Sequence, residues 1–367
     1  MQKNYHIERL SRLRRIVKEE ALDSVLISAA PTIAYLTGYH GFSVVERDGY
    51  LLATQNKAYL FTSGLYRDAV QDIAGIAVIE TTIKSPFLEN LKTILKKDRI
   101  KTAGYEANFL SVAEYHRLSP LFEKMANLPL RTLREIKSSD EINTIQHACS
   151  LGLAALVETL PHAQPGISEQ KLAGTLEIAI KQMGANLSFP TIIAFGKNSA
   201  VPHHLTGETK LGKQDVVVLD FGVLYKGYCS DISRTIFVGT PTKVQQKAYN
   251  AVLEAQTRAV SFIRQQLKLK RPVSAKETDK IARDYILSQG FPSIPHSLGH
   301  GIGIEVHESP TLSPVSRDLL TNGMVFSIEP GIYLAGKFGI RIEDLFAIEK
   351  NKLRQLTHSP LYSSKNK

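Results

Sequence analysis

The sequence predicts a mixed α/β (α+β) fold in two domains, a smaller one over residues 1–128 and a larger one over residues 129–367. Three observations lead to this division. Helical and strand-like patterns alternate over roughly the first 125 residues. Pro129 then interrupts the pattern, and Ser138 followed three residues later by Glu141 forms a capping box that begins a long helix. Beyond it, two similar helical segments indicate an internally duplicated domain.

The first domain is expected to combine helices with short strands. Apolar residues recur at helical spacing from Ile7 to Val17 and predict a helix. The later elements follow in chain order: a strand at Ser24–Ser28, a short helix from Pro31 toward Gly38, strands at Gly49–Ala53, Ala58–Thr62 and Ile76–Glu80, a helix at Pro86–Lys97 and a strand at Thr102–Glu106. The residues Thr54–Lys57 predict a hairpin. We find no catalytic group of residues here.

Two segments of the second domain resemble each other, Gly166–Gly184 and Pro272–Gly290. Each begins with a serine cap and ends at a glycine. A Phe-Pro or Ile-Pro step follows each, and then a histidine, His203 or His307. The residues between these points are dissimilar, so chance similarity is the alternative. A true repeat would place two similar halves across a shared cleft.

The composition restricts the location and the partners. Cys149 and Cys229 are the only two cysteines, and no CxxC pair occurs. This indicates a reducing compartment, and we expect a cytoplasmic protein without a disulfide framework. The N-terminus MQKNYHIERLSRLRRIVKEE has no apolar core, and no run approaches the roughly 18 apolar residues that cross a bilayer. We therefore expect neither a secretory signal nor a membrane span.

The net charge of +10 raises the question of nucleic-acid binding. Its densest segments are Arg9–Lys18 and Lys268–Arg271. The first alternates with the apolar residues of the expected helix, so its basic residues form a solvated face. No aromatic interleaving or nucleic-acid motif accompanies the charge. We expect no nucleic-acid partner.

Two aspartates lie at the ends of strand-like runs. Val216–Val223 reads as a strand that carries Asp220, and Tyr228–Thr235 leads back as a second strand that carries Asp231. Tyr225-Lys226-Gly227 turns the chain between them. A hairpin of this length can bring the two carboxylates together from neighbouring strands. The alternative is that both are ordinary turn residues.

A glycine-rich segment, HSLGHGIGIEVHE, contains His296, His300 and His307. Its three glycines allow the backbone to approach a metal or a substrate closely. A single histidine is more often structural, whereas three in so short a run favour a functional site.

Two glutamates follow in apolar strand contexts. Glu329 lies at a strand end before a Pro-Gly turn, and Glu343 lies inside an expected strand. Acids in such strands are costly to bury unless they are paired or bound to metal. Arg341 offers a structural pairing as the alternative, especially for Glu343.

Four carboxylates in one cleft would repel one another and raise each other's pKa values. Two divalent cations would neutralise them. Oxygen-rich ligation with one imidazole suits Mn²⁺ or Co²⁺, with Zn²⁺ as a further possibility. Such a pair, about 3.5–4 Å apart, holds a hydroxide and polarises a carbonyl group.

The motifs DFGVLYKGYCSDISRT, HSLGHGIGIEVHE, FSIEPGIY and GIRIEDLFAI occur in this order. With them the sequence resembles the pita-bread metallopeptidases, in particular the proline-directed branch of aminopeptidase P and prolidase. The likeness extends to RLSRLRRIVKEEALDSVLISAAPTIAYLTGYHG and covers nearly the whole chain. It implies a creatinase-like N-terminal domain, a pita-bread catalytic domain with pseudo-twofold halves, and a homodimer.

The resemblance also implies residue roles. Asp220 would bind one metal, Asp231 and Glu343 would bridge both, and His300 and Glu329 would complete the second site. The remaining positions line the substrate site: His203, with its neighbour His204 as a possible misassignment, His296, His307 and Arg341. Among these, His307 would steady the scissile carbonyl and His203 would assist it.

The implied reaction removes an N-terminal residue that precedes proline. A metal-bridging hydroxide would attack the carbonyl carbon, and Glu329 would carry the proton to the proline nitrogen. One alternative is a strict prolidase that acts only on Xaa-Pro dipeptides. Another is a non-catalytic pita-bread module that binds proteins or nucleic acids. Such modules normally lose metal ligands, and all five ligand positions are filled here.

Overall fold

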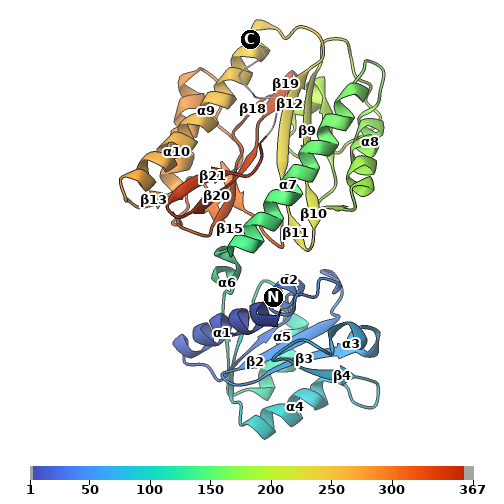
Figure 1. Ribbon diagram of the computed structural model, residues 1–367, viewed down its shortest axis with the longest axis vertical. Coiled ribbons are helices and arrows are strands. Elements are labelled where there is room, and N and C mark those ends of the chain that lie inside the picture. Colours follow the sequence, from blue (N-terminus) through green and yellow to red (C-terminus); the bar gives the residue numbers. More distant parts are fainter. Residues whose placement is uncertain (1–2, 359–367) are drawn as a thin grey trace. The chain divides into compact units, whose positions relative to one another are not determined.

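The computed structural model describes residues 3–358, with side chains from residue 5 onward. The chain forms two compact units that meet between Arg134 and Glu135, a few residues beyond the boundary expected at 128 and 129. Both units combine helices with sheets, as the sequence predicts (Figure 1). No helix among the described residues is long and apolar enough to cross a membrane.

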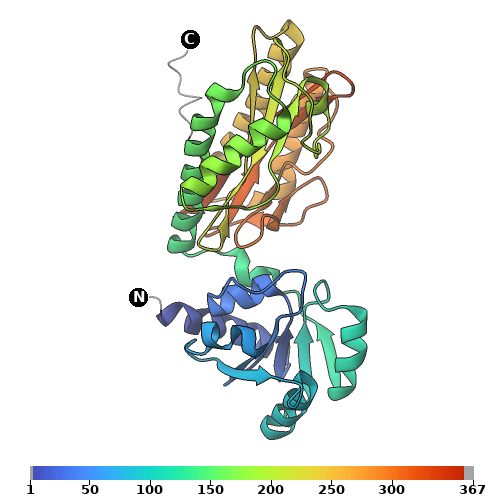
Figure 2. The ribbon, with the colours of Figure 1, turned by 90° about the vertical axis from the view of Figure 1, so that its right-hand side faces the viewer.

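The first unit is a six-stranded mixed sheet in the order β4-β3-β2-β1-β5-β6. Helices cover both of its faces (Figure 2), and all four residues of β1 are buried. Its strands are β1 (Ser24–Ile27), β2 (Gly49–Thr54), β3 (Ala58–Ser63), β4 (Ala77–Thr81), β5 (Thr102–Tyr105) and β6 (Lys124–Asn127). Its helices are α1 (Lys3–Glu19), α2 (Ala30–Thr37), α3 (Gly64–Val70), α4 (Phe87–Asp98) and α5 (Val112–Leu118), and α6 (Arg131–Glu135) spans the boundary.

The predicted hairpin is confirmed. β2 and β3 pair antiparallel with Ala53 opposite Ala58, and the Thr54 hydroxyl accepts a hydrogen bond from the backbone N–H of Lys57 inside the turn. β1 lies between antiparallel β2 and parallel β5. This central position explains why its sequence is a continuous apolar run rather than an alternating one.

A cluster of polar side chains connects α5 to the segment around β2. The Glu114 carboxylate accepts hydrogen bonds from Arg47 at 2.7 Å and from Tyr50 at 2.6 Å. Burial alone would raise the pKa of Glu114, but these donors outweigh it and hold the pKa at about 2 instead of 4.5. A carboxyl group whose folded pKa is depressed stabilises the fold above its unfolded pKa. That stability is lost as the pH falls through the folded value.

We therefore expect Glu114→Gln to destabilise the protein at neutral pH. The difference from wild type should shrink as the pH falls from about 4.5 toward about 2, because protonation removes the same charge from wild type. Urea unfolding followed by circular dichroism at several pH values measures this difference. A gap that stays constant with pH would contradict the assigned role of the Glu114 charge.

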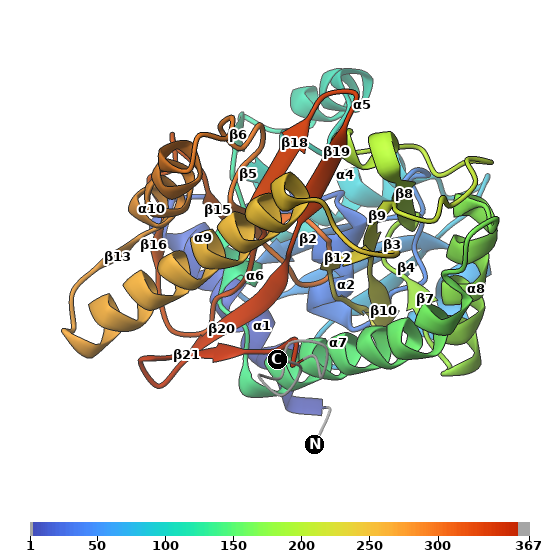
Figure 3. The same ribbon diagram turned by 90° about the horizontal axis from the view of Figure 1, so that it is seen from above.

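The second unit contains two helix pairs, α7 with α8 and α9 with α10, whose members pack against each other (Figure 3). These helices are α7 (Ser139–Thr159), α8 (Glu169–Gln182), α9 (Lys243–Lys268) and α10 (Ala275–Ser288). The first sheets are β11-β10-β7 and β12-β9-β8, made of β7 (Asn186–Leu187), β8 (Ile192–Phe195), β9 (Val216–Phe221), β10 (Val223–Tyr225), β11 (Tyr228–Cys229) and β12 (Ile232–Phe237).

The remaining strands lie with α9 and α10 in the sequence. They form a five-stranded sheet, β15-β14-β17-β20-β21, and two ribbons, β18-β19 and β13-β16. Their bounds are β13 (Val273–Ser274), β14 (Gly299–Gly301), β15 (Glu308–Leu312), β16 (Leu319–Leu320), β17 (Val325–Ile328), β18 (Gly331–Leu334), β19 (Phe338–Arg341), β20 (Asp344–Glu349) and β21 (Lys352–Gln355).

Local signals correctly placed three helices of the second unit, α7, α8 and α10, whereas α9 was not predicted. Ser138 and Glu141 form the reciprocal capping box at the start of α7. Ser168 and Ser274 cap α8 and α10, and both helices contain 14 residues. Gly184 and Gly290 follow these helices with φ of +76° and +80°, a conformation that glycine adopts without a Cβ penalty. The two segments are therefore similar in structure as well as in sequence pattern.

Each helix pair has its own hydrophobic core with the strands beside it. Leu156, Leu176 and Leu219 belong to the core of α7 and α8, whereas Ile263 and Phe326 belong to the core of α9 and α10. The two parts are joined through backbone groups of β12, where the Ser233 carbonyl accepts a hydrogen bond from the Glu343 N–H at 3.0 Å. The expected carboxylates lie at this junction.

Candidate metal centre

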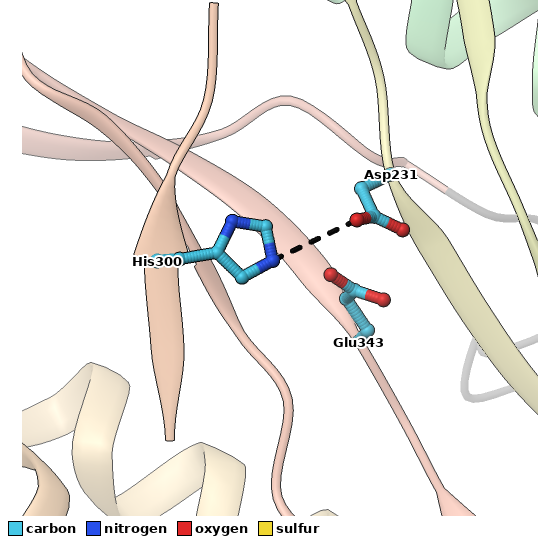
Figure 4. Close-up of side chains that lie close together, drawn as sticks. All are labelled: Asp231, His300 and Glu343. Carbon is cyan, nitrogen blue, oxygen red and sulfur yellow. Dashed lines mark ion pairs between the residues drawn. The ribbon is translucent and has the colours of Figure 1, made fainter. Parts of the chain in front are cut away.

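Acidic and imidazole side chains from separate strands, and from residues next to strands, converge inside the second unit. Asp231, His300 and Glu343 each offer a ligand atom, and these atoms all lie within 4.8 Å of one another (Figure 4). His300 Nε2 lies 3.7 Å from Asp231 Oδ2 and 3.3 Å from Glu329 Oε1. Asp220 lies on β9 opposite Ser233. The five predicted ligands therefore belong to one region of the fold.

The hairpin of β9 and β12 supplies the two aspartates. These strands pair antiparallel from Ile232 opposite Phe221 onward. Asp231 lies directly before β12, where the strand is interrupted rather than continuous as the sequence suggested. Glu343 likewise lies in a break between β19 and β20 instead of inside one strand. Asp231 and Glu343 therefore do not belong to the regular ladders of the strands on either side.

His300 lies on β14, and Glu329 directly follows β17. The Ser327 hydroxyl accepts a hydrogen bond from the His300 N–H at 3.0 Å and donates one to Glu329 Oε1 at 3.1 Å. His300 Nδ1 lies 3.0 Å from the carbonyl oxygen of Gly301. A proton on Nδ1 satisfies that carbonyl, and Nε2 faces the carboxylates, where it would offer its lone pair to a bound cation after losing its proton. This is the arrangement that a metal-binding histidine needs.

Two glycines of this segment are needed for the packing of β14. A Cβ on Gly299 would collide with the backbone of Ser327, and a Cβ on Gly301 would collide with the backbone of Ser309. These glycines allow β14 to lie close against the chain segments beside it.

The charges of the site are strongly perturbed. Burial, followed by the neighbouring carboxylates, raises the pKa of Asp231 well above its ordinary value. The same causes raise the pKa of Glu343 to about 8. Burial also raises the pKa of Glu329, but the hydrogen bond and charge of His300 outweigh it and lower this pKa overall. Raised pKa values of this kind are typical of buried carboxylates whose negative charge is not neutralised by nearby cations.

Unpartnered oxygens test whether cations fit this site. Asp220 Oδ1, Asp231 Oδ1 and Glu343 Oε1 are buried and have no hydrogen-bond partner among the described residues. Buried polar atoms are normally satisfied, and each orphan is costly. Three orphaned carboxylate oxygens together with Nε2 of His300, which faces Asp231 and Glu329, form a donor set that suits divalent cations. The residues therefore fit the metal pair.

Arg341 was expected, as the structural alternative to a site role, to pair with a carboxylate, in particular Glu343. It does form such a pair, but with Asp220. Its guanidinium donates to Asp220 Oδ2 at 2.6 Å, to the Ser233 hydroxyl at 2.8 Å and to the Tyr333 hydroxyl at 3.0 Å. Ser233 donates in turn to Glu343 Oε2 at 2.9 Å. Arg341 is thus buried against two of the expected ligands, one directly and one through a serine.

Tyr333 is a neighbour of the site that sequence reasoning missed. Its hydroxyl lies 3.0 Å from His296 Nε2, while His296 Nδ1 lies 2.8 Å from the Ser297 carbonyl. If Nδ1 donates to that carbonyl, Tyr333 donates to Nε2 and accepts from Arg341. The motif FSIEPGIY contained a signal for Tyr333, because this residue lies on β18, the strand that begins two residues after Glu329.

The remaining histidines differ from one another. The His307 ring packs edge to face against the His300 ring, with centroids 4.3 Å apart. Burial is the main cause that lowers the pKa of His296 and of His307, and the nearby His203 contributes to both shifts. His204 instead lies 2.8 Å from Glu169 Oε2 at the start of α8. Thus His203, His296 and His307 share one region, and His204 has a structural partner.

Comparison with known proteins adds to this geometry. Residues 143–350 match metallopeptidase family M24, and residues 9–136 match the creatinase/prolidase N-terminal domain. An Xaa-Pro dipeptidase of Pyrococcus horikoshii is 35% identical over 95% of this chain and 97% of its own length. The structure of an Xaa-Pro dipeptidase from Bacillus anthracis superposes with a TM-score of 0.89 at 32% identity, covering 97% of this chain and 98% of that one. An X-Pro aminopeptidase from Thermotoga maritima gives a TM-score of 0.83 at 32% identity, covering 94% and 98%.

Proposed function

Because the chain belongs to metallopeptidase family M24, in its proline-directed branch, we propose that this peptidase hydrolyses the bond between an N-terminal residue and a following proline. One observation carries the proposal furthest. Four carboxylates and one imidazole, from five separate motif positions, converge on a buried region where three carboxylate oxygens have no partner among the described residues.

We propose that two divalent cations, Mn²⁺ by preference and Co²⁺ or Zn²⁺ as alternatives, bind there. Asp220 would hold one, His300 and Glu329 the other, and Asp231 and Glu343 both. When bound, the cations would supply a hydroxide nucleophile at neutral pH and polarise the scissile carbonyl.

Glu329 is the proposed proton carrier. His300 lowers its pKa, so its carboxylate is ionised at neutral pH and can accept a proton from the nucleophile. The proline nitrogen carries no hydrogen in the substrate, so it must be protonated before it leaves. Glu329 would deliver that proton, and general acid–base catalysis of this kind contributes roughly 10²- to 10⁴-fold in rate.

The histidines near the centre would bind the reacting carbonyl. The lowered pKa of His307 keeps its ring neutral at physiological pH, and a neutral imidazole still offers one N–H to a developing oxyanion. His203 would act beside it. Tyr333 and Arg341 orient His296, which would line the pocket of the substrate.

A strict dipeptidase is the second candidate function, since two of the relatives described above are named Xaa-Pro dipeptidases. The choice depends on whether the cleft accepts residues beyond the proline. The non-catalytic alternative is disfavoured, because all five ligand positions are filled and their side chains lie in one region.

The experiment that tests this proposal compares an Xaa-Pro dipeptide with an Xaa-Pro-Pro tripeptide, each with added Mn²⁺ and after chelation. Metal-dependent cleavage of the tripeptide indicates an aminopeptidase, and cleavage of the dipeptide alone indicates a strict prolidase. Failure to cleave either with Mn²⁺, Co²⁺ or Zn²⁺ would refute the proline assignment.

The neighbouring histidines 203 and 204 should respond differently to replacement by alanine. The Glu169 carboxylate accepts hydrogen bonds from the Phe195 N–H and the Asn198 amide as well as contacting His204. Loss of His204 removes one partner of this buried group and should lower the melting temperature by a few degrees. His203 is exposed, so His203→Ala should leave the melting temperature unchanged while lowering kcat/KM by roughly tenfold or more. Calorimetry and peptide hydrolysis on both variants measure these effects. The opposite pattern would assign the substrate-site role to His204 and the structural role to His203.

We also propose a cytoplasmic homodimer. Cys149 and Cys229 are free and buried, which suits a reducing compartment. The dimer follows from family resemblance and is checked by the mass of the protein in solution.

A further inference from the structure

A buried ion pair lies next to the segment that carries His307. Lys137 Nζ lies 3.0 Å from Glu308 Oε2, and the two side chains are 1% and 5% exposed. Taking both charges out of water is costly, and apolar residues of similar volume often stabilise a fold equally well. Stability alone therefore does not explain this pair. Neither residue has a step in the proposed reaction.

The Glu308 carboxylate organises the turn that precedes it. Its Oε1 accepts hydrogen bonds from the N–H groups of Ile304 at 3.1 Å and Glu305 at 3.2 Å. A Cβ on Gly303 would lie 2.5 Å from Glu308 Oε2, so a glycine is needed for the carboxylate to lie against this backbone. Residues 303–308 thus close around the Glu308 side chain, and His307 directly precedes it.

Lys137 is itself held in place. Its backbone N–H donates to the Gly323 carbonyl at 2.8 Å, in the turn before β17. The next residue, Ser138, caps α7. From the other side, the Cys229 N–H donates to the Gly303 carbonyl at 2.7 Å. The ammonium group therefore reaches the turn from a fixed backbone position, and the turn is fixed at both of its ends.

The position of His307 depends on this turn, because its ring packs on the ring of His300 with centroids 4.3 Å apart. We propose that Lys137 is a positioning residue: through the Glu308 carboxylate it holds the turn 303–308 so that His307 stays on His300 and faces the substrate carbonyl. The catalytic part of this inference rests on the proposed function. A misplacement of about 1 Å at such a group can cost on the order of 100-fold in rate.

The first test is Lys137→Met, which keeps most of the length of the side chain but removes the ammonium group that pairs with the Glu308 carboxylate. We expect kcat for an Xaa-Pro dipeptide to fall about tenfold or more, with a smaller change in KM, and Lys137→Arg to restore part of the loss. In a His307→Ala background the same change should cost less than about twofold, because the residue being positioned is already absent. Equal losses in both backgrounds would overturn the inference.

A second measurement does not depend on activity or on metal. In hydrogen exchange of the protein, the amides of Ile304 and Glu305 should exchange at least about tenfold faster in Lys137→Met, while the amides of α8 stay unchanged. Unchanged exchange at these two amides would contradict the role of Lys137. If Lys137→Met fails to fold, Glu308→Gln provides the same comparison with nearly the same shape. A further outcome is that wild type cleaves no Xaa-Pro peptide while exchange at these amides still increases in Lys137→Met. That result would refute the proposed substrate but support the role of Lys137 in holding the turn.

Discussion

Replacement of Asp231 by asparagine is expected to reduce peptide hydrolysis by at least roughly 10³-fold, because an amide cannot supply the negative charge that two shared cations require. Asp231 is 5% exposed, and its Oδ1 has no hydrogen-bond partner among the described residues. The same replacement should lower the bound metal from two ions per chain. Elemental analysis of the purified protein together with a hydrolysis assay measures both effects.

The apo form of this variant should be at least as stable as apo wild type. Burial, followed by the neighbouring carboxylates, raises the pKa of Asp231, so an uncharged asparagine avoids the cost of a buried charge and relieves the repulsion. Asp284→Asn is the matched control, since Asp284 is an exposed aspartate of the same unit in a surface ion pair with Lys280 and such pairs contribute little. Full activity and full metal content in Asp231→Asn would remove this residue from the site.

The second large effect is expected from Glu329→Gln. Glutamine keeps an oxygen beside His300 but accepts no proton, so kcat should fall by roughly 10²- to 10⁴-fold. The pKa of His300, now raised to about 9 by Glu329 in spite of burial, should fall as well. Kinetics with an Xaa-Pro dipeptide and titration of the His300 ring by NMR in the metal-free protein measure the two effects.

Glu158→Gln is a suitable control for Glu329→Gln, because Glu158 is an exposed residue of α7. A near-normal kcat in Glu329→Gln would exclude Glu329 as the proton carrier. A loss of rate that disappears when excess Mn²⁺ is added would show that Glu329 serves only as a ligand.

The elements that the sequence predicted well are those that local interactions determine. The hairpin of β2 and β3 needs only a short turn between two apolar runs. The starts of α7, α8 and α10 follow from serine side chains that bond to backbone three residues away. These signals act within a few residues, so they can be read without knowledge of the fold.

The contacts around the metal ligands required the structure. Arg341 and Asp220 are 121 positions apart in the chain, and Lys137 and Glu308 are 171 positions apart. No local pattern indicates which carboxylate an arginine in a strand will meet. The ligands themselves could be selected because each lies in or at the end of an apolar strand-like run or in a glycine-rich segment, where a buried charge requires an explanation. The assignment of each ligand to one cation or to both followed from the family resemblance.

The measurement that tests the central claim most directly is a titration of metal-free protein with Mn²⁺, in which bound metal and hydrolysis of an Xaa-Pro dipeptide are followed together. Our account predicts saturation at two ions per chain, with hydrolysis that rises as the sites fill and is lost on chelation. Hydrolysis that is independent of added metal would contradict it. So would a wild-type protein that binds no ion at high Mn²⁺ concentration.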